Sequence, residues 1–288
     1  MEGQLSAWAE GDANVRAVFL GGSRADPSAD VDELSDWDVE AVVDDLEPFL
    51  RGDEWLQRFG GPLIRWPLSP GPTLDGGGVT RLVLFEDGTR IDFQLRDTAA
   101  RPAALAESRF RVLRDPDGLF EAAAARRPGG YSVRPPSAAE YRRVCLEMWW
   151  DATYVPKCLF RGRLPMARYM LDCVMRQQHL NPMVEWKIGI HTDWTANPGP
   201  HGRDFVRYLD RRTWSDYAAT FARGECKPTW RAFEAMAGLF GRLGREVGGE
   251  LGYGYPDRTE RRILDYCRQV IQHGGYGGRP GGGPDEGG

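Results

Sequence analysis

The chain has 288 residues, a formal net charge of −5 and a hydrophobic fraction of 41%, which is typical of an acidic globular protein with a sizeable core. No run of Lys and Arg offsets the acidic balance, so we expect no nucleic-acid partner, because such partners are held mainly by neutralising phosphates. The five cysteines are widely spaced and include no C-x-x-C pair, so neither a disulfide framework nor a zinc site is indicated.

The N-terminal stretch "MEGQLSAWAEGDANVRAVFLGG" has no basic segment followed by an apolar run, as a secretion signal would have. No apolar stretch approaches the roughly 20 residues that a membrane-spanning helix needs. We therefore expect a cytoplasmic monomer with no membrane partner.

The first half of the chain has the pattern of a mixed α/β domain. A short helix is expected at Gln4–Trp8, and the apolar run Val15–Gly22 indicates a buried strand that enters a tight turn. A helical stretch is expected at Leu46–Arg58, followed by a Pro/Gly-rich loop around "RWPLSPGPTLDGGG".

Two aspartates separated by one residue lie in "DWDVEAVV", which begins at Asp36. In a strand the side chains alternate between the two faces, so Asp36 and Asp38 point to the same side. A third aspartate, Asp92, lies in "VTRLVLFEDGTRIDFQLRD", where Asp87-Gly88 between two β-rich segments indicates a hairpin. Gln94, two residues after Asp92, lies on the same face of the strand as Asp92.

The second half is predicted to be helical. "RRPGGYSVRPPS" (126–137) has the composition of a linker, and Ser137 followed by Glu140 is typical of a capping box. The glycine-rich end, 273–288, is expected to be disordered. Helices are expected after Ser137 and around Pro165–Gln177, Gly202–Arg211, Trp214–Ala222, Pro228–Val247 and Arg258–His273.

The three aspartates have the chemistry of a nucleotidyl-transfer site. Transfer from a nucleoside triphosphate requires neutralised phosphate oxygens and an activated hydroxyl, which Mg²⁺ held by carboxylates can supply. Asp36 and Asp38 would bind the metal, and Asp92 on a neighbouring strand would complete its shell and accept the proton of the nucleophile. The alternative is that these aspartates only form a solvated acidic face of a strand, which an isolated Asp-x-Asp more often does.

The Gly-Gly-Ser turn that precedes these aspartates fits a phosphate cradle. Gly21 and Gly22 allow a sharp turn and a close approach of backbone to phosphate, and Ser23 offers a hydroxyl and an N–H group. Arg24 could add charge-assisted contacts. Taken alone, the same three residues are also a common surface turn.

The order hydrophobic-Gly-Ser, Asp-x-Asp and a later apolar-Asp-apolar resembles the DNA polymerase β-like nucleotidyltransferase superfamily. Together with "EMWWDATYVPKCLFRGRLPMARYMLD", "EWKIGIHTDW" and "RYLDRRTWSDYAATFA", these motifs look like the aminoglycoside 6-adenylyltransferase, or streptomycin adenylyltransferase, family over about residues 15–245. The resemblance implies an α+β protein with an N-terminal nucleotidyltransferase domain at 1–130, a mixed sheet with helices. A C-terminal α-helical bundle domain that binds the substrate would occupy 137–272.

The family resemblance implies transfer of AMP from Mg-ATP to a hydroxyl of streptomycin, with release of pyrophosphate. It assigns Gly22 and Ser23 to the phosphate loop, Asp36 and Asp38 to the metal ligands, and Asp92 to the third carboxylate. Lys157 matches the lysine of the family's "TYVxK" segment and would reach the triphosphate.

Streptomycin carries guanidinium groups, so its pocket should present carboxylates and aromatic faces. Residues of these types in the helical half that we expect to contact the acceptor are Glu147, Trp149, Asp151, Asp172, Glu185, Trp186 and Asp193. Each could instead be structural: Glu147 lies on a helix flank, and of the adjacent Trp149 and Trp150 one is expected in the core. Of the four histidines, none has a motif-like setting, so capping or surface roles are expected.

Two alternatives remain open from the sequence. The acceptor could be another antibiotic, such as a nucleoside or a different aminoglycoside modified for self-resistance, or a protein hydroxyl. The chain could also be a binding protein built on a degenerate nucleotidyltransferase domain, although the retained carboxylates argue against decay.

Overall fold

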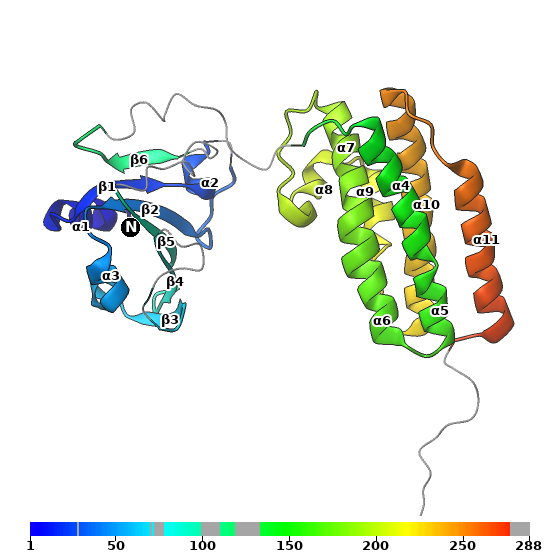
Figure 1. The fold of residues 1–288 in the computed structure, drawn as a ribbon, viewed down its shortest axis with the longest axis horizontal. Coiled ribbons are helices and arrows are strands. Elements are labelled where there is room, and N and C mark those ends of the chain that lie inside the picture. Colours follow the sequence, from blue (N-terminus) through cyan, green and yellow to red (C-terminus); the bar gives the residue numbers. More distant parts are fainter. Residues whose placement is uncertain (28, 70, 72–77, 99–109, 119–132, 277–288) are drawn as a thin grey trace, which may run out of the picture. The chain divides into compact units, whose positions relative to one another are not determined.

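The structure is a computed structural model that describes residues 1–27, 29–69, 71, 78–98, 110–118 and 133–276. The chain divides into two compact units, Met1–Gly130 and Tyr131–Gly288 (Figure 1). The first contains a mixed sheet with helices and the second is helical, which confirms the predicted α+β class. Most of the predicted linker (126–132) and the tail from residue 277 lie outside the described residues.

The first unit is built on a six-stranded sheet with the order β3-β4-β5-β2-β1-β6. β2 and β5 are parallel, and the other neighbouring strands are antiparallel. The strands are β1 (Val15–Leu20), β2 (Trp37–Val43), β3 (Pro62–Trp66), β4 (Val79–Phe85), β5 (Arg90–Asp97) and β6 (Arg111–Arg114). Its helices are α1 (Glu2–Gly11), α2 (Gly22–Ala25), α3 (Glu47–Arg51) and the 3-10 helix η1 (Glu54–Arg58).

The two faces of this sheet differ in chemistry because apolar and polar residues alternate along β2 and β5. Val39 on β2 and Phe93 on β5 are fully buried against side chains of α1, α3 and η1, such as Trp8. The opposite face presents Asp38 and Asp92. The apolar face therefore anchors the strands, and the polar face carries the candidate site.

The hairpin predicted at Asp87-Gly88 is confirmed, because β4 and β5 pair antiparallel around it. Gly88 has φ +84° and its N–H donates to the Phe85 carbonyl at 2.9 Å, which closes the turn. The expected helix at Leu46–Arg58 is instead two short helices, α3 and η1, because Gly52 between them is extended. The sequence analysis did not anticipate β3 and β6, two short edge strands.

The second unit is a bundle of helices with one contiguous core. Its elements are α4 (Ala138–Ala152), α5 (Tyr154–Phe160), α6 (Leu164–Tyr169), the π-helix η3 (Met170–Leu180), α7 (Asn181–His191), the 3-10 helix η4 (Pro200–Gly202), α8 (Phe205–Tyr208), α9 (Arg211–Ala218), α10 (Cys226–Leu251) and α11 (Asp257–Gly274). No helix of the described residues is long and apolar enough to cross a membrane.

The first helix of the bundle begins as the capping signature predicts, with the Ser137 hydroxyl accepting a hydrogen bond from the Glu140 N–H at 3.1 Å. It breaks at Thr153 between α4 and α5. Pro156 has no N–H to donate to the Ala152 carbonyl four residues earlier. The buried Cys267 thiol of α11 donates to that carbonyl instead, at 3.7 Å.

The segment after α5 is more helical than expected. α6, η3 and α7 follow one another with helical backbone angles at their junctions, so the "EWKIGIHTDW" motif begins inside α7. The helix expected at Gly202–Arg211 is wrong over most of its length. Only the single turn of α8 forms there, and His201 has a positive φ of +58°.

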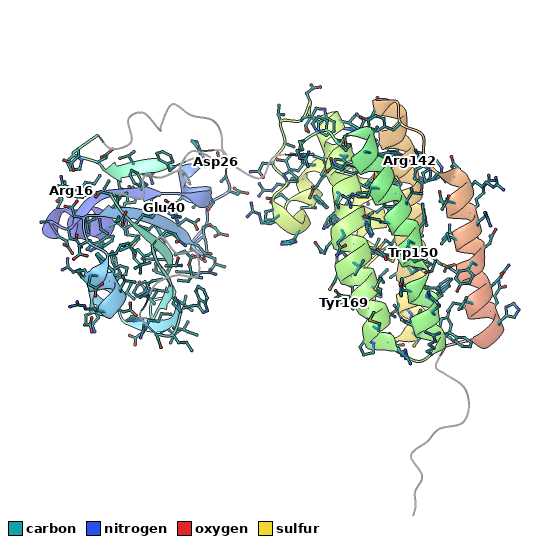
Figure 2. All side chains as sticks on the ribbon, in the orientation of Figure 1. Arg16, Asp26, Glu40, Arg142, Trp150 and Tyr169 are labelled. Atoms are coloured by element: carbon teal, nitrogen blue, oxygen red, sulfur yellow. The ribbon has the colours of Figure 1, made fainter. Side chains whose placement is uncertain are left out.

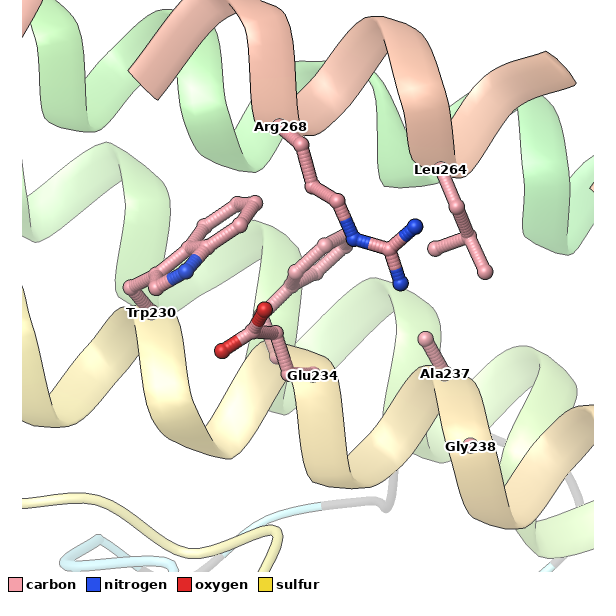
Figure 3. Close-up of a pocket in the computed structure, with 7 residues that line it drawn as sticks. Trp230, Glu234, Ala237, Gly238, Leu264 and Arg268 are labelled. Atoms are coloured by element: carbon pink, nitrogen blue, oxygen red, sulfur yellow. The ribbon is translucent and has the colours of Figure 1, made fainter. Parts of the chain in front are cut away.

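A small hollow lies between α10 and α11, lined by Trp230, Glu234 and Arg268 among others (Figure 3). Its volume of about 80 Å³ is below that of a site for a nucleotide or an aminoglycoside. It is a packing gap between two helices.

Candidate active site

The Gly-Gly-Ser turn leads from the end of β1 into α2. The Gly21 N–H donates to the Asp38 carbonyl at 2.8 Å, which fixes the turn against the strand that carries the carboxylates. Gly22 has φ +57°, and a Cβ atom at this position would collide with Oδ2 of Asp38. Glycine is therefore required for both backbone and space. Ser23 follows within α2 and is half-buried.

The parallel pairing of β2 and β5 brings two of the three predicted carboxylates together. Asp38 lies directly opposite Asp92, and Trp37 lies opposite Ile91. Neighbouring strands are about 4.8 Å apart, so these two side chains are adjacent on one face. Asp36 immediately precedes β2 at the same edge, and its side chain is 38% exposed.

Negative charge and burial raise proton affinity on this face. Burial is the first cause that raises the pKa of Asp38 above its usual value, and the charges of Asp92 and Asp36 add to it, while Arg90 opposes them. The pKa of Glu40, the next residue on this face of β2, is also raised by burial and by Asp38. Figure 2 marks Glu40 on the sheet. The site is thus a partly desolvated acidic surface that favours a cation.

Arg90 is a site residue that the sequence analysis missed. Its guanidinium donates to both carboxylate oxygens of Asp92, at 3.1 and 3.0 Å, and lies 3.4 Å from Oδ2 of Asp36. The signal was available, because Arg90 precedes Asp92 by two residues on the same strand and so shares its face.

Arg24 supports the loop that delivers Asp36. It donates to the carbonyls of Ser35 at 2.7 Å, Asp36 at 3.1 Å and Asp32 at 3.3 Å. Its guanidinium also stacks over the Trp37 ring at 3.9 Å. These contacts occupy much of the side chain that was expected to bind phosphate, and Trp37 is half-buried beneath it.

The donor set has the chemistry that Mg²⁺ prefers, since three carboxylates gather at one sheet edge beside a turn too close-packed for a side chain. Within the part of the chain that the structure describes, however, no three His, Cys, Asp or Glu side chains are oriented as a ready metal site. The Arg90 guanidinium contacts two of the three carboxylates, those of Asp92 and Asp36.

Two of the predicted acceptor residues are core residues, and this corrects the expectation that they offer an aromatic face. Trp149 is fully buried, with its ring edge-to-face against Phe240 and its Nε1–H donating to the Tyr255 hydroxyl at 3.2 Å. Trp186 is 6% exposed and packs near Tyr141. Trp150, which is adjacent to Trp149 in the chain, is 69% exposed.

Three of the predicted acidic acceptor residues already have partners in the helical unit. Glu147 pairs with Arg143 at 2.6 Å. Asp172 lies between Arg168 and Arg176, at 2.7 and 2.9 Å, so its charge is largely compensated. The carboxylate of Asp151 is hydrogen-bonded to His179 Nε2 at 2.8 Å.

The remaining two acidic candidates lie on or just after α7. Glu185 is half-buried. Asp193 is exposed, in a turn where Asp193 and Trp194 both have positive φ. This turn folds the Trp194 ring onto Gly189, where a Cβ atom would collide with it. The motif "EWKIGIHTDW" thus contains a structural turn.

The prediction for His179 was wrong, because this residue is 2% exposed and has neither a surface nor a capping role. Its Nδ1 has no hydrogen-bond partner among the described residues. For His191 and His273 the capping role is confirmed, since each Nδ1 approaches the carbonyl four residues earlier, at 3.0 and 2.8 Å. His201 is exposed and lies 3.2 Å from Gln177.

Lys157 on α5 lies over the Tyr154 ring at 4.4 Å. It lines an open groove of about 420 Å³ between α5 and α11, to which Arg161 and His273 also contribute. Among the described residues that line it there is no carboxylate, so the groove presents positive charge that suits an anion such as a phosphate.

A model of the family described as streptomycin adenylyltransferase matches residues 1–270. The match makes the chain a nucleotidyl-transferring enzyme. The chain belongs to the streptomycin adenylyltransferase family, which confirms the resemblance drawn from the motifs.

The chain is also similar to individual proteins of this kind. It is 29% identical over 261 residues to the aminoglycoside 6-adenylyltransferase of Bacillus subtilis (strain 168), covering 86% of this chain and 89% of the relative. It is 27% identical over 276 residues to that of Campylobacter jejuni, covering 93% of each. The crystal structure of an aminoglycoside 6-adenyltransferase from Bacillus subtilis covers 93% of this chain and is itself covered to 96%, at 24% identity and a TM-score of 0.49.

Proposed function

We propose that this protein transfers AMP from Mg-ATP to a hydroxyl group of streptomycin and releases pyrophosphate. The observation that carries the proposal is the register of β2 and β5, which sets Asp38 beside Asp92 at the turn formed by Gly22. Membership of the family supports the same reaction.

The donor would be held through its triphosphate. Asp36 and Asp38 would bind Mg²⁺, which when bound neutralises charge on the phosphate oxygens and orients them. The backbone at Gly22 and the hydroxyl of Ser23 would contact phosphate oxygens, and Lys157 would add a point charge. Arg24 would act mainly by holding the loop of Asp36 in place, because its donors already serve that loop.

Asp92 would be the general base. The oxygen of the acceptor hydroxyl forms a bond to the α-phosphorus while the bond from that phosphorus to the bridging oxygen breaks and pyrophosphate leaves. The hydroxyl proton passes to a carboxylate oxygen of Asp92. Both of these oxygens accept a hydrogen bond from Arg90, which lowers their basicity, so release of either one would make Asp92 a stronger base.

The acceptor would be recognised through its positive charge. The acidic candidates are Glu147, Asp151, Asp172, Glu185 and Asp193. Glu147, Asp151 and Asp172 would have to exchange their present partners. Trp150, whose side chain lies on the outside of α4 (Figure 2), offers the aromatic face that Trp149 cannot. Because much of the predicted acceptor set is already paired or buried, a different aminoglycoside or a nucleoside antibiotic is the second candidate.

The test is incubation of the purified protein with Mg-ATP and a panel of aminoglycosides and nucleoside antibiotics, with mass spectrometry of the products. We expect streptomycin to gain one AMP and an equal amount of pyrophosphate to appear. If only another compound gains AMP, that compound replaces streptomycin as the proposed acceptor, and the proposed reaction stays the same. No adduct on any compound, with retained ATP binding, would favour a binding protein.

The proposal includes a monomeric enzyme in the cytoplasm, where ATP and the entering antibiotic meet. Light scattering coupled to size-exclusion chromatography would test the monomer, and fractionation of the native cells would test the compartment.

A further inference from the structure

Arg90 is the only described residue whose side chain contacts two of the three site carboxylates. It lies on β5, 47% exposed, and reaches along the strand to Asp92 and across to Asp36. The contact to Asp92 uses two guanidinium nitrogens and both carboxylate oxygens. The ion pair is therefore a fork-to-fork contact in the middle of the proposed metal site.

A guanidinium and a divalent metal ion compete for the same electron pairs. Arg90 holds Oδ1 and Oδ2 of Asp92 and approaches Oδ2 of Asp36, and these are the hard oxygen ligands that Mg²⁺ would use. A guanidinium and a Mg²⁺ ion that contact the same carboxylates also repel one another, so binding of one weakens binding of the other.

We propose that Arg90 is a built-in competitor of the metal ion, which must release Asp92 and Asp36 before the site can be loaded. This inference rests on the proposed function, because it takes Asp36 and Asp92 to belong to a metal site. It makes Arg90 a positioning residue that couples metal loading to nucleotide binding: the phosphates of ATP attract the guanidinium and so favour its release.

The pair is suited to exchange. A half-exposed ion pair contributes little net stability, since water screens it, and a double charge outcompetes a single one at the same oxygens. If Arg90 instead only oriented Asp92 for the metal, its removal would weaken metal binding, which is the opposite of what a competitor predicts.

The experiment measures binding of Mn²⁺ to the whole protein by electron paramagnetic resonance, without nucleotide. The variant is Arg90→Gln. We expect Mn²⁺ to bind on the order of tenfold more tightly than in the wild type, because a charge at the ligands has gone. Arg90→Lys, which keeps the charge and loses the fork, should lie between the two.

Arg16 is the matched control. It lies on β1 of the same unit between two other carboxylates, Asp117 at 2.5 Å and Asp44 at 3.5 Å. Arg16→Gln removes the same charge from a similar two-carboxylate setting outside the site and should leave Mn²⁺ affinity unchanged. Melting curves of each variant check that the fold is retained.

A second readout tests the coupling. Addition of the α,β-methylene analogue of ATP should tighten Mn²⁺ binding in the wild type by a larger factor than in Arg90→Gln. Unchanged or weaker Mn²⁺ binding in Arg90→Gln, with Asp36→Asn abolishing binding, overturns the inference and leaves the metal site intact. Mn²⁺ binding that neither substitution alters overturns the metal site and the inference together.

Discussion

The strands of the first unit and the helices of the second hold acidic side chains in different ways. On β2 and β5, Asp38 and Asp92 face one another across a parallel register, and a single guanidinium bridges from Asp92 to Asp36. On α4 and η3, Glu147 and Asp172 form ion pairs with arginines four residues away in the chain. The strand carboxylates are concentrated against one another, whereas the helix carboxylates are neutralised locally. Concentrated charge is the better mark of a reaction site.

The first prediction tests the concentrated set and has the largest expected effect. Asp92→Asn or Asp36→Asn should lower kcat by about a thousandfold or more, because metal and base roles act as a unit. Steady-state release of pyrophosphate measures it. Glu54→Gln, an exposed acid of the same unit, is the control and should keep full turnover. Full activity in both aspartate variants would contradict the assignment.

The second prediction separates the adjacent tryptophans of α4. Trp149→Ala should lower the free energy of unfolding by roughly 3–5 kcal/mol, since a fully buried ring and its hydrogen bond are lost. Trp150→Ala should change it by less than about 0.5 kcal/mol. Urea denaturation measures both. If Trp150 contacts the acceptor, its variant should raise KM for the acceptor and leave the stability intact.

The third prediction compares the two glycines of the turn. Gly22→Ala should destabilise the protein by about 1–3 kcal/mol and reduce turnover, because it combines a positive φ with a collision at Asp38. Gly21→Ala should be tolerated, since its Cβ would lie 3.7 Å from that of Asp38, an ordinary contact. Thermal melts and kcat measured on both variants check this pair, and equal effects would contradict it.

The fourth prediction concerns Asp151 and its buried partner. Asp151→Asn should lower the free energy of unfolding by about 1 kcal/mol, because a charge-assisted hydrogen bond to His179 becomes a weaker one. A KM for the acceptor that stays unchanged would assign Asp151 to the helix core, and a rise in KM would restore it to the acceptor site. Glu147→Gln, four residues earlier, is the comparison.

The first unit was the more predictable of the two. The alternation of "DWDVEAVV" and the turn at Asp87-Gly88 determine which side chains share a face, and the parallel pairing then sets Asp38 against Asp92. The short edge strands β3 and β6 were missed because their pairing partners, not their own few residues, stabilise them.

In the helical unit, the chemical type of a side chain was a weaker predictor of whether it can contact the acceptor. Trp149 and Asp172 were chosen for their side chains, but burial and pairing depend on which neighbouring helix each one faces. The Ala152 carbonyl left open by Pro156 accepts from a thiol of α11, and buried Arg176 of η3 donates to the carbonyl of Thr220. Such contacts are remote in sequence and leave no local pattern.

The parallel pairing of β2 with β5 also limits stability. Asp38 and Asp92 are more than fifty residues apart in the chain, so folding itself creates their repulsion. Burial first, and then the charges of Asp92 and Asp36, raise the pKa of Asp38 on folding. The ionised group therefore opposes the native state at neutral pH, and this penalty disappears in acid below the unfolded pKa. Asp38→Asn should accordingly melt at a higher temperature than the wild type at pH 7 while losing turnover. The candidate site on β2 and β5 is then a place where burial and like charge lower the stability of the fold, and a bound cation reduces that cost.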